Sequence, residues 1–202
     1  MVSEFWDARY AGNDYHFGTE PAAFVARWAH LVAPGARVLT IAEGEGRNAV
    51  HLAARGAHVT AMDGSPVAVA KAHRLAVERD VEVDFRVADI GAWEWQDAAF
   101  DVALGVFFQF AQPPLRAAIF AGLAQTLVPG GLLLLHGYAP RQIGYGTGGP
   151  PVAENLWTLE MLHAAFPGFE VLHEADYDAE IEEGRGHAGR SALIDFVARK
   201  PV

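Results

Sequence analysis

The chain has 202 residues, of which 51% are hydrophobic and 20% charged, so one domain over residues 1–202 can bury a full core. Its formal net charge of −10 argues against a nucleic-acid partner, because affinity for a phosphate backbone depends largely on Lys and Arg. There is no cysteine, hence no disulfide and no thiolate metal site, and we predict no metal cofactor. No signal-like amino end and no membrane-length apolar run are present, so we expect a cytoplasmic protein without a membrane partner.

The first predicted element is an aromatic segment over residues 1–20. Its aromatic side chains are Phe5, Trp6, Tyr10, Tyr15 and Phe17. Two interpretations stay open: a short helix packed on the domain edge, or a lid whose aromatic residues, including Tyr15, cover a bound cofactor. A helix follows from Pro21, with Phe24, Val25 and Trp28 at helical spacing, and Pro34-Gly35 ends it.

The next stretch combines a strand, a glycine turn and a helix. An apolar run over residues 38–41 leads into Gly44-x-Gly46, and helix formers follow from about Arg47 to Arg55. Glycines at such a turn let a ligand approach the backbone, and the helix amino terminus favours polar and anionic groups. The second strand ends in Asp63, whose carboxylate can accept hydrogen bonds from both hydroxyls of a ribose. These features predict a nucleoside-containing cofactor, and the glycine pattern alone leaves NAD open.

The rest of the chain continues the alternation of helices and strands. We predict helix 65–79, strand 81–87 ending at Ala88-Asp89-Ile90, strand 100–108, helix 113–127, strand 132–136, helix 158–166 and strands 169–177 and 191–199. Repeated β–α order predicts a doubly wound parallel sheet of the α/β class. The last two strands lack a helix between them, so we expect them to be antiparallel neighbours.

Two glycine-rich segments are candidates for binding the substrate. Residues 137–155 are either a surface connection or a substrate loop, because loops at the carboxyl ends of parallel strands hold ligands. Residues 182–190 are either a solvated turn or a local cationic site for an anionic or ionised acceptor. Under the second interpretation the substrate residues are Tyr138, Gln142, Tyr145 and Arg185, and the catalytic residues are His187 and Arg190.

Several motifs together resemble one family. They are Gly44-Glu45-Gly46-Arg47-Asn48-Ala49, the run 59–66 with Asp63, Ala88-Asp89-Ile90, Phe100-Asp101-Val102, Pro129-Gly130-Gly131, Trp6-Asp7-x-Arg9-Tyr10 and the glycines of 146–149. With them the chain resembles the class I S-adenosylmethionine-dependent methyltransferases, and within these the small tellurite-resistance and thiopurine methyltransferase-like group. The family commonly has an acid at the position of Thr40 and Gly at that of Ala42, so the chain departs from it there.

The resemblance implies a mostly parallel, seven-stranded, Rossmann-like sheet that ends in an antiparallel hairpin, with helices on both faces. It also implies S-adenosyl-L-methionine as the cofactor and methyl transfer to a small-molecule acceptor such as a thiol or an oxyanion. The implied cofactor-binding residues are Ala42, Glu43, Gly44, Gly46, Asn48, Asp63, Gly64, Ser65, Ala88, Asp89, Ile90, Gly105 and Tyr15. The alternatives are a protein that binds S-adenosylmethionine without catalysis and an NAD-dependent oxidoreductase.

Overall fold

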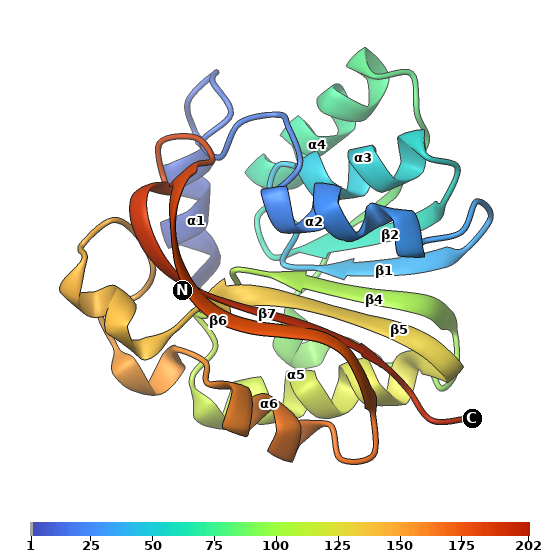
Figure 1. Ribbon diagram of the computed structural model, residues 1–202. Coiled ribbons are helices and arrows are strands. Elements are labelled where there is room, and N and C mark those ends of the chain that lie inside the picture. Colours follow the sequence, from blue (N-terminus) through green and yellow to red (C-terminus); the bar gives the residue numbers. More distant parts are fainter. Residues whose placement is uncertain (1) are drawn as a thin grey trace. The chain divides into compact units, whose positions relative to one another are not determined.

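The computed structural model describes residues 2–202, and the side chains from residue 4 onward. The chain forms two compact units. One consists of Met1–Trp93 with Glu183–Gly186, and the other of Glu94–Glu182 with His187–Val202. Each unit contains strands and helices of its own (Figure 1).

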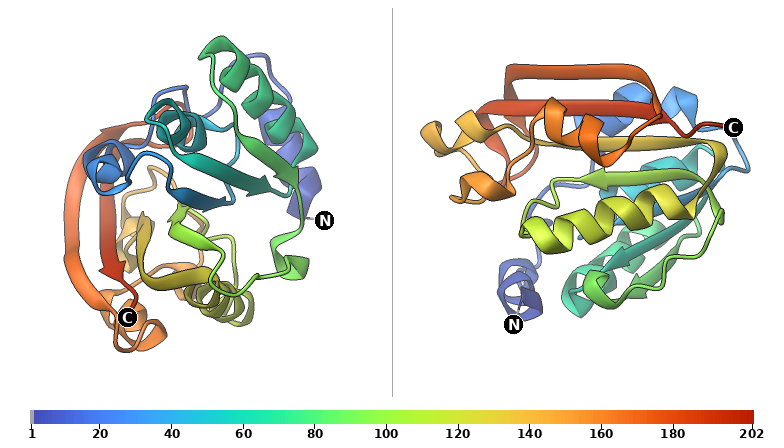
Figure 2. Two further views of the ribbon diagram at one scale, coloured as in Figure 1. Left: turned by 90° about the vertical axis from the view of Figure 1, so that its right-hand side faces the viewer. Right: turned by 90° about the horizontal axis from the view of Figure 1, so that it is seen from below.

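The first unit is built around three parallel strands. Its elements are α1 (Val2–Tyr10), α2 (Ala23–Trp28), β1 (Arg37–Ile41), α3 (Arg47–Ala54), β2 (His58–Asp63), α4 (Pro66–Glu78) and β3 (Asp84–Val87). β2 pairs in parallel with both β1 and β3, and the three strands are seen together in Figure 2, left. β3 is shorter than predicted and its side chains are half-buried or exposed, as on an edge strand.

The predicted turn and cap chemistry of this unit is confirmed. Gly44 and Gly46 have φ values of +64° and +90°, in the left-handed region that favours glycine. A Cβ atom on Gly46 would lie 2.6 Å from the Cβ of Ala72 in α4, so a larger residue would separate turn and helix. Ser65 caps α4, because its Oγ accepts a hydrogen bond from the Ala68 N–H at 3.1 Å, and Pro66 is the first helical residue.

The second unit contains two parallel strands followed by an antiparallel hairpin. Its elements are β4 (Phe100–Val106), α5 (Pro113–Thr126), β5 (Leu127–Tyr138), α6 (Leu159–Ala165), β6 (Glu170–Glu182) and β7 (Ala188–Arg199). β4 is parallel to β5, whereas β7 is antiparallel to both β5 and β6. α5 runs along β4 and β5 (Figure 2, right).

The strand order of the chain is β3-β2-β1-β4-β5-β7-β6 in a seven-stranded sheet. Among the pairs described above, β5–β7 and β7–β6 are antiparallel and the others are parallel. The predicted α/β class, with a mostly parallel sheet and a final antiparallel hairpin, is therefore confirmed.

The boundary between α5 and β5 was predicted wrongly. Leu127 continues the helical spacing of apolar residues, but α5 ends at Thr126 and Leu127 is the first residue of β5. Leu127 pairs with Phe100, and the register then shifts so that Val102 pairs with Leu132. The Pro-Gly-Gly run at 129–131 lies in this irregularity, where a sequence pattern cannot distinguish the end of a helix from a bulge.

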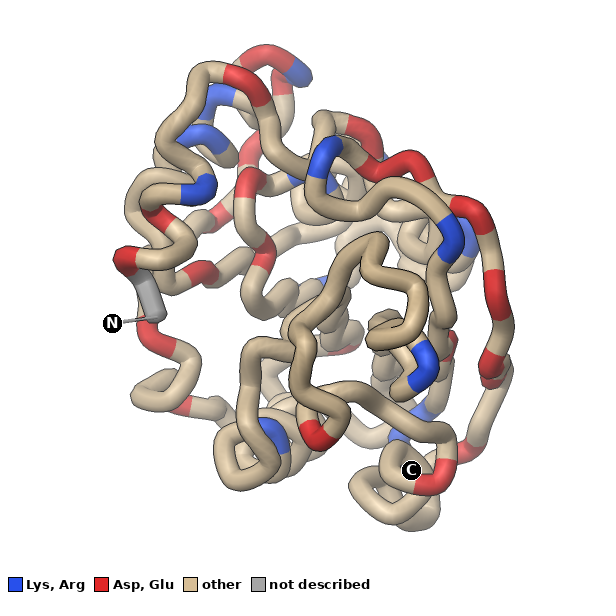
Figure 3. The backbone as a smooth tube through the Cα atoms, turned by 90° about the vertical axis from the view of Figure 1, so that its left-hand side faces the viewer, with Lys and Arg blue, Asp and Glu red and all other residues tan. Residues whose placement is uncertain are grey.

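The final hairpin is longer than predicted, and Arg190 lies in β7 rather than in the link. The outer face of β6 carries exposed acids at alternate positions, the period of a strand with one face in solvent. They are Glu170, Glu174, Asp176, Asp178, Glu180 and Glu182. Figure 3 shows acidic segments following one another along this long edge strand.

Glu43 caps α3 from the turn that precedes it. Its Oε1 accepts hydrogen bonds from the backbone N–H groups of Asn48 at 2.9 Å and Ala49 at 2.8 Å. Burial raises the pKa of Glu43 from 4.5 to about 7, although these hydrogen bonds lower it. The helix amino terminus is therefore capped by a carboxyl group whose ionisation the fold disfavours.

The ionisation of Glu43 predicts a pH-dependent stability. Because its folded pKa lies above its unfolded value, its stabilising contribution is present below pH 4.5 and is lost as the pH rises through about 7. Glu43→Gln keeps an accepting oxygen but does not ionise. We expect the free energy of unfolding of the wild type, relative to this variant, to fall by about 3 kcal/mol between about pH 4.5 and pH 8.

Urea denaturation across this pH range measures the effect. The control is Glu82→Gln, because Glu82 is exposed. If the difference in unfolding free energy between the wild type and Glu43→Gln does not change with pH, then ionisation of Glu43 does not destabilise the fold.

Candidate functional site

Asp63 joins the end of β2 to the glycine turn after β1. Its Oδ2 accepts a hydrogen bond from the Gly44 N–H and its Oδ1 accepts one from the Ser65 N–H, both at 2.8 Å. Burial raises the pKa of Asp63, and these backbone hydrogen bonds oppose the rise. Each carboxylate oxygen keeps a second lone pair, so the group fits the predicted role of accepting hydrogen bonds from a ribose diol.

Other predicted cofactor residues lie at the same carboxyl edge of β1, β2 and β3. Ala42, directly after β1, has a φ of +48°, a strained value for a residue other than glycine. The Ala88 N–H donates to the Asp63 carbonyl at 2.9 Å, which places the residues after β3 beside the end of β2. Asp89 caps the short turn Ile90–Ala92 through the Gly91 N–H at 2.9 Å and remains exposed.

Tyr10 covers the glycine turn. A Cβ atom on Gly44 would lie 3.0 Å from its hydroxyl oxygen, and Tyr10 is only 5% exposed. Burial, and next the Asp63 carboxylate, raise the Tyr10 pKa well above its usual value. Nearby, Asp7 accepts a hydrogen bond from the Ser65 hydroxyl at 2.5 Å. α1 thus contacts the glycine turn through Tyr10 and the cap of α4 through Asp7.

Tyr15 lies elsewhere in this unit. Its hydroxyl donates to the Lys71 carbonyl at 3.3 Å, and its ring packs against Val50, Leu75 and Ala76 of α3 and α4. Tyr10, rather than Tyr15, is therefore the tyrosine that contacts Gly44. The aromatic composition of the segment was visible in the sequence, but it did not indicate which ring would meet the turn.

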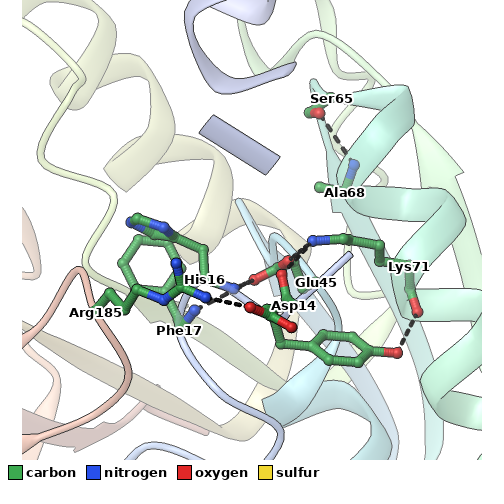
Figure 4. Close-up of polar contacts among 9 residues, drawn as sticks. Asp14, His16, Phe17, Glu45, Ser65, Ala68, Lys71 and Arg185 are labelled. Carbon is green, nitrogen blue, oxygen red and sulfur yellow. Dashed lines mark hydrogen bonds and ion pairs between the residues drawn. The ribbon is translucent and has the colours of Figure 1, made fainter. Parts of the chain in front are cut away.

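A buried ion pair fixes the segment that follows α1. The Lys71 Nζ lies 2.6 Å from the Glu45 Oε1, and their side chains are 3% and 2% exposed (Figure 4). The other Glu45 oxygen accepts hydrogen bonds from the backbone N–H groups of His16 at 2.6 Å and Phe17 at 3.3 Å. Lys71 also donates to the Asp14 carbonyl at 2.7 Å. Sequence reasoning missed this network; the one signal for it was a Lys within an apolar helix face.

The hairpin turn 183–186 belongs to the first unit and packs on the same segment. The Arg185 N–H donates to the His16 carbonyl at 2.9 Å, and the Arg185 guanidinium pairs with Asp14. Glu183 forms an ion pair with Arg47 of α3 at 2.7 Å. The Arg185 side chain is 72% exposed, so in this structure the predicted substrate residue forms a surface ion pair.

In the second unit, the Phe107 ring contacts three other rings near the carboxyl ends of β4 and β5. Its ring centroid lies 4.1 Å from that of His187, 4.6 Å from that of Tyr138 and 4.7 Å from that of His136. Phe107 has a φ of +52°, a strained value for a bulky residue. The structure therefore brings the predicted residues Tyr138 and His187 together in one buried aromatic cluster.

The predicted residues Gln142, Tyr145 and Arg190 have other partners. Gln142 joins the loop after β5 to β7, because its Oε1 accepts from the Ala192 N–H at 2.7 Å. Asp178 accepts hydrogen bonds from the Tyr145 hydroxyl at 2.6 Å and from Arg190 at 2.8 Å. Arg190 thus has its charge balanced at the surface.

Gly105, in β4, has a packing role. A Cβ atom on it would lie 2.5 Å from the Phe108 ring, so the side chain of any other residue would displace that ring.

Comparisons with known proteins show which chains this one resembles. Residues 38–131 match the model of a family described as a methyltransferase domain. A ubiquinone biosynthesis O-methyltransferase of Xanthomonas campestris pv. campestris is 34% identical over 137 residues, which are 67% of this chain and 56% of the relative. The enzyme of the same name from Xylella fastidiosa is 37% identical over 136 residues, 67% of this chain and 54% of the relative. The chain thus spans about half the length of the curated relatives it matches.

Solved structures share the fold. A structure described under the conversion of a disulfide bond into a thioacetal group during echinomycin biosynthesis has a TM-score of 0.79 and 20% identity. The match covers 100% of this chain and 93% of the chain in that structure. TehB from Haemophilus influenzae has a TM-score of 0.72 and 18% identity, and the match covers 98% of this chain and 66% of TehB. Within the part of the chain that the structure describes, no helix has the length and apolar character needed to span a membrane. Residues 38–131 thus match a methyltransferase domain, and the curated relatives and the shared fold together support a class I S-adenosylmethionine-dependent methyltransferase.

Proposed function

We propose that the protein transfers the methyl group of S-adenosylmethionine to a small-molecule acceptor. The observation that carries the proposal is the Asp63 carboxylate, held by the N–H groups of Gly44 and Ser65 at the end of β2. It provides an anionic hydrogen-bond acceptor for a ribose diol. Beside it lies the turn at Gly44 and Gly46, whose left-handed backbone favours glycine. The cofactor supplies an activated methyl group on a sulfonium, so the task of the chain is mainly to bind, orient and exclude water.

The proposed cofactor site lies along the carboxyl edge of the first unit. It consists of Ala42, Gly44, Gly46, Asp63, Gly64, Ser65, Ala88, Asp89 and Ile90. Glu43 and Asn48 support it indirectly: Glu43 caps α3, and the Asn48 side chain accepts from the Ala22 N–H at 2.9 Å before α2. Tyr10 and Asp7 of α1 are proposed to close over the ribose end, the place for which the sequence suggested Tyr15.

For the acceptor, we propose a small molecule that reacts through oxygen or sulfur. The relatives in the comparison are O-methyltransferases by name, which supports an oxygen acceptor. The aromatic cluster of Phe107, Tyr138 and His187 is the proposed acceptor side of the second unit. A binding protein without catalysis is distinguished by turnover, since only an enzyme forms S-adenosylhomocysteine from S-adenosylmethionine and an acceptor.

The first test is the choice of cofactor. We expect S-adenosylhomocysteine to bind with a micromolar Kd, about −8 kcal/mol, and NAD to bind about 100-fold more weakly or not at all. Isothermal titration calorimetry measures both. Tight binding of NAD without binding of S-adenosylhomocysteine would contradict the proposal and favour the oxidoreductase alternative.

The second test concerns Asp63. Asp63→Ala removes the acceptor for the ribose hydroxyls and should weaken S-adenosylhomocysteine binding by about 1.5–3 kcal/mol, the scale of hydrogen bonds to a charged group. Asp84→Ala is the matched control, because Asp84 is an exposed acid on the neighbouring strand β3. A folded Asp63→Ala protein with wild-type affinity would show that Asp63 does not hold the ribose.

The third test separates the acceptor side from the cofactor side. His187→Ala should lower turnover by about tenfold or more with a nearly unchanged cofactor affinity, because His187 packs on Phe107 and Tyr138. Arg190→Ala tests the other predicted catalytic residue in the same assay. S-adenosylhomocysteine formation is measured with a panel of small thiols, phenols and oxyanions. Full activity in both variants would remove these residues from the proposed acceptor site.

A further inference from the structure

The hairpin turn 183–186 contains two glycines that the proposed cofactor and acceptor sites leave unexplained. A Cβ atom on Gly184 would lie 2.5 Å from the His16 carbonyl oxygen, and one on Gly186 would overlap the Phe17 ring. Gly184 also has a φ of +73°, in the left-handed region that favours glycine. The two glycines therefore let this turn lie directly against the amino-terminal segment.

Glu183 links the hairpin turn to the helix that follows the glycine turn. Its Oε2 accepts a hydrogen bond from the Arg47 guanidinium at 2.7 Å, and its Oε1 accepts one from the Ala23 N–H at 2.9 Å. The Arg47 guanidinium also donates to the Phe17 carbonyl at 3.2 Å. The side chains of Arg47 and Glu183 are 8% and 10% exposed. Removing one partner of such a pair is costly, because it leaves a desolvated charge alone.

Residues 14–17, here called the strap, are also held by Glu45 and Lys71. The Glu45 carboxylate accepts hydrogen bonds from two strap N–H groups at 2.6 and 3.3 Å, and the Lys71 Nζ donates to a strap carbonyl at 2.7 Å (Figure 4). Glu45 lies between Gly44 and Gly46 in the sequence. The glycine turn of the proposed cofactor site and the hairpin turn therefore contact the same strap.

The strap follows α1 closely in the chain, and α1 contacts the proposed cofactor site. Tyr10 covers Gly44, and Asp7 accepts a hydrogen bond from the Ser65 hydroxyl. Even when fully extended, the chain from Tyr10 to Asp14 spans only about 14 Å. As long as the strap is held, α1 therefore cannot move far from the glycine turn.

We propose that the strap controls the exchange of the cofactor, and that Glu183 and Arg47 are positioning residues for this control. The inference rests on the proposed binding of S-adenosylmethionine in the first unit. While the hairpin turn holds the strap, α1 stays at the glycine turn and dissociation of the ligand is slow. When the strap is released, α1 can move away and the ligand exchanges. The hairpin turn 183–186 thus acts on the cofactor, although the sequence suggested a site for the acceptor there.

This role differs from a purely structural one in its kinetics. Segments that gate a ligand open without unfolding the core. The strap residues belong to no helix or strand, and side chains from other parts of the unit hold their backbone. Loosening the strap should therefore raise the dissociation rate of the ligand, whereas damage to the binding site itself would lower the association rate.

The first measurement is the binding kinetics of S-adenosylhomocysteine by surface plasmon resonance. We expect Glu183→Ala to raise the dissociation rate constant by about tenfold or more, the factor that corresponds to one lost hydrogen bond to a charged group. The association rate constant should not fall. Gly184→Ala should act in the same direction, because a Cβ atom there has no room beside His16. The matched control is Glu180→Ala, because Glu180 is an exposed acid of the same hairpin, and its rates should equal those of the wild type.

The second measurement is amide hydrogen exchange at His16 and Phe17, whose N–H groups donate to Glu45. S-adenosylhomocysteine should slow this exchange in the wild type, and Glu183→Ala should speed it by about tenfold in the ligand-free protein. The amide of Leu39, a fully buried residue of β1, should exchange as in the wild type, which separates opening of the strap from unfolding. If Glu183→Ala does not fold, Gly184→Ala decides both measurements, because it leaves the Glu183 side chain in place.

The outcomes separate this role from the alternatives. Faster dissociation together with faster exchange in the strap supports control of the cofactor by the hairpin turn. Wild-type dissociation rates in folded variants would overturn it, and so would faster dissociation without faster exchange in the strap, or a weaker affinity caused by slower association. A wild-type protein that does not bind S-adenosylhomocysteine would instead contradict the proposed function.

Discussion

The arrangement of the first unit depends on one carboxylate that bridges two backbone amides. Asp63 accepts from the Gly44 N–H after β1 and from the Ser65 N–H before α4, so one side chain holds the end of one strand against the beginning of the next helix. Ser65 in turn caps α4 and donates to Asp7 of α1. The geometry around the proposed ribose position therefore depends on hydrogen bonds within the chain itself.

Each unit contains a buried pair of titratable side chains that joins distant parts of the chain. In the first, Lys71 and Glu45 bond to each other and to the backbone of residues 14–17, so the pair acts as a structural tie. In the second, the His136 Nδ1 lies 2.7 Å from the Asp195 Oδ1, across the pairing of β5 with β7. Both pairs are shielded from water, where a hydrogen-bonded partner offsets the cost of burying a polar group.

Local features of the fold were predictable from the sequence because their causes are local. Gly44 and Gly46 were predicted from a turn that requires left-handed backbone, and Ser65-Pro66 from the chemistry of a helix start. The choice of Asp63 followed from its place at the end of a strand. In the structure its carboxylate accepts hydrogen bonds from two backbone amides, and its role in binding a ribose stays a prediction.

The remaining features depend on pairings between distant residues. Glu45 and Lys71 are 26 residues apart, and His136 and Asp195 are 59 apart, so their contacts appear only once helix packing or strand register is known. Tyr10 and Tyr15 could not be distinguished because both are aromatic and lie in one segment. Leu127 fitted the helical pattern of α5, and only its pairing with Phe100 shows that it starts a strand.

The acidic side chains along β6 have a consequence for how the protein behaves at high concentration. An edge strand of 13 residues has main-chain donors and acceptors on its outer side that another extended chain can join. If a second copy paired with β6, carboxylates such as Glu170, Glu180 and Glu182 would face carboxylates of that copy. Like charges in facing positions destabilise strand pairing. The acids along β6 thus oppose fibre-like growth from this edge of the sheet.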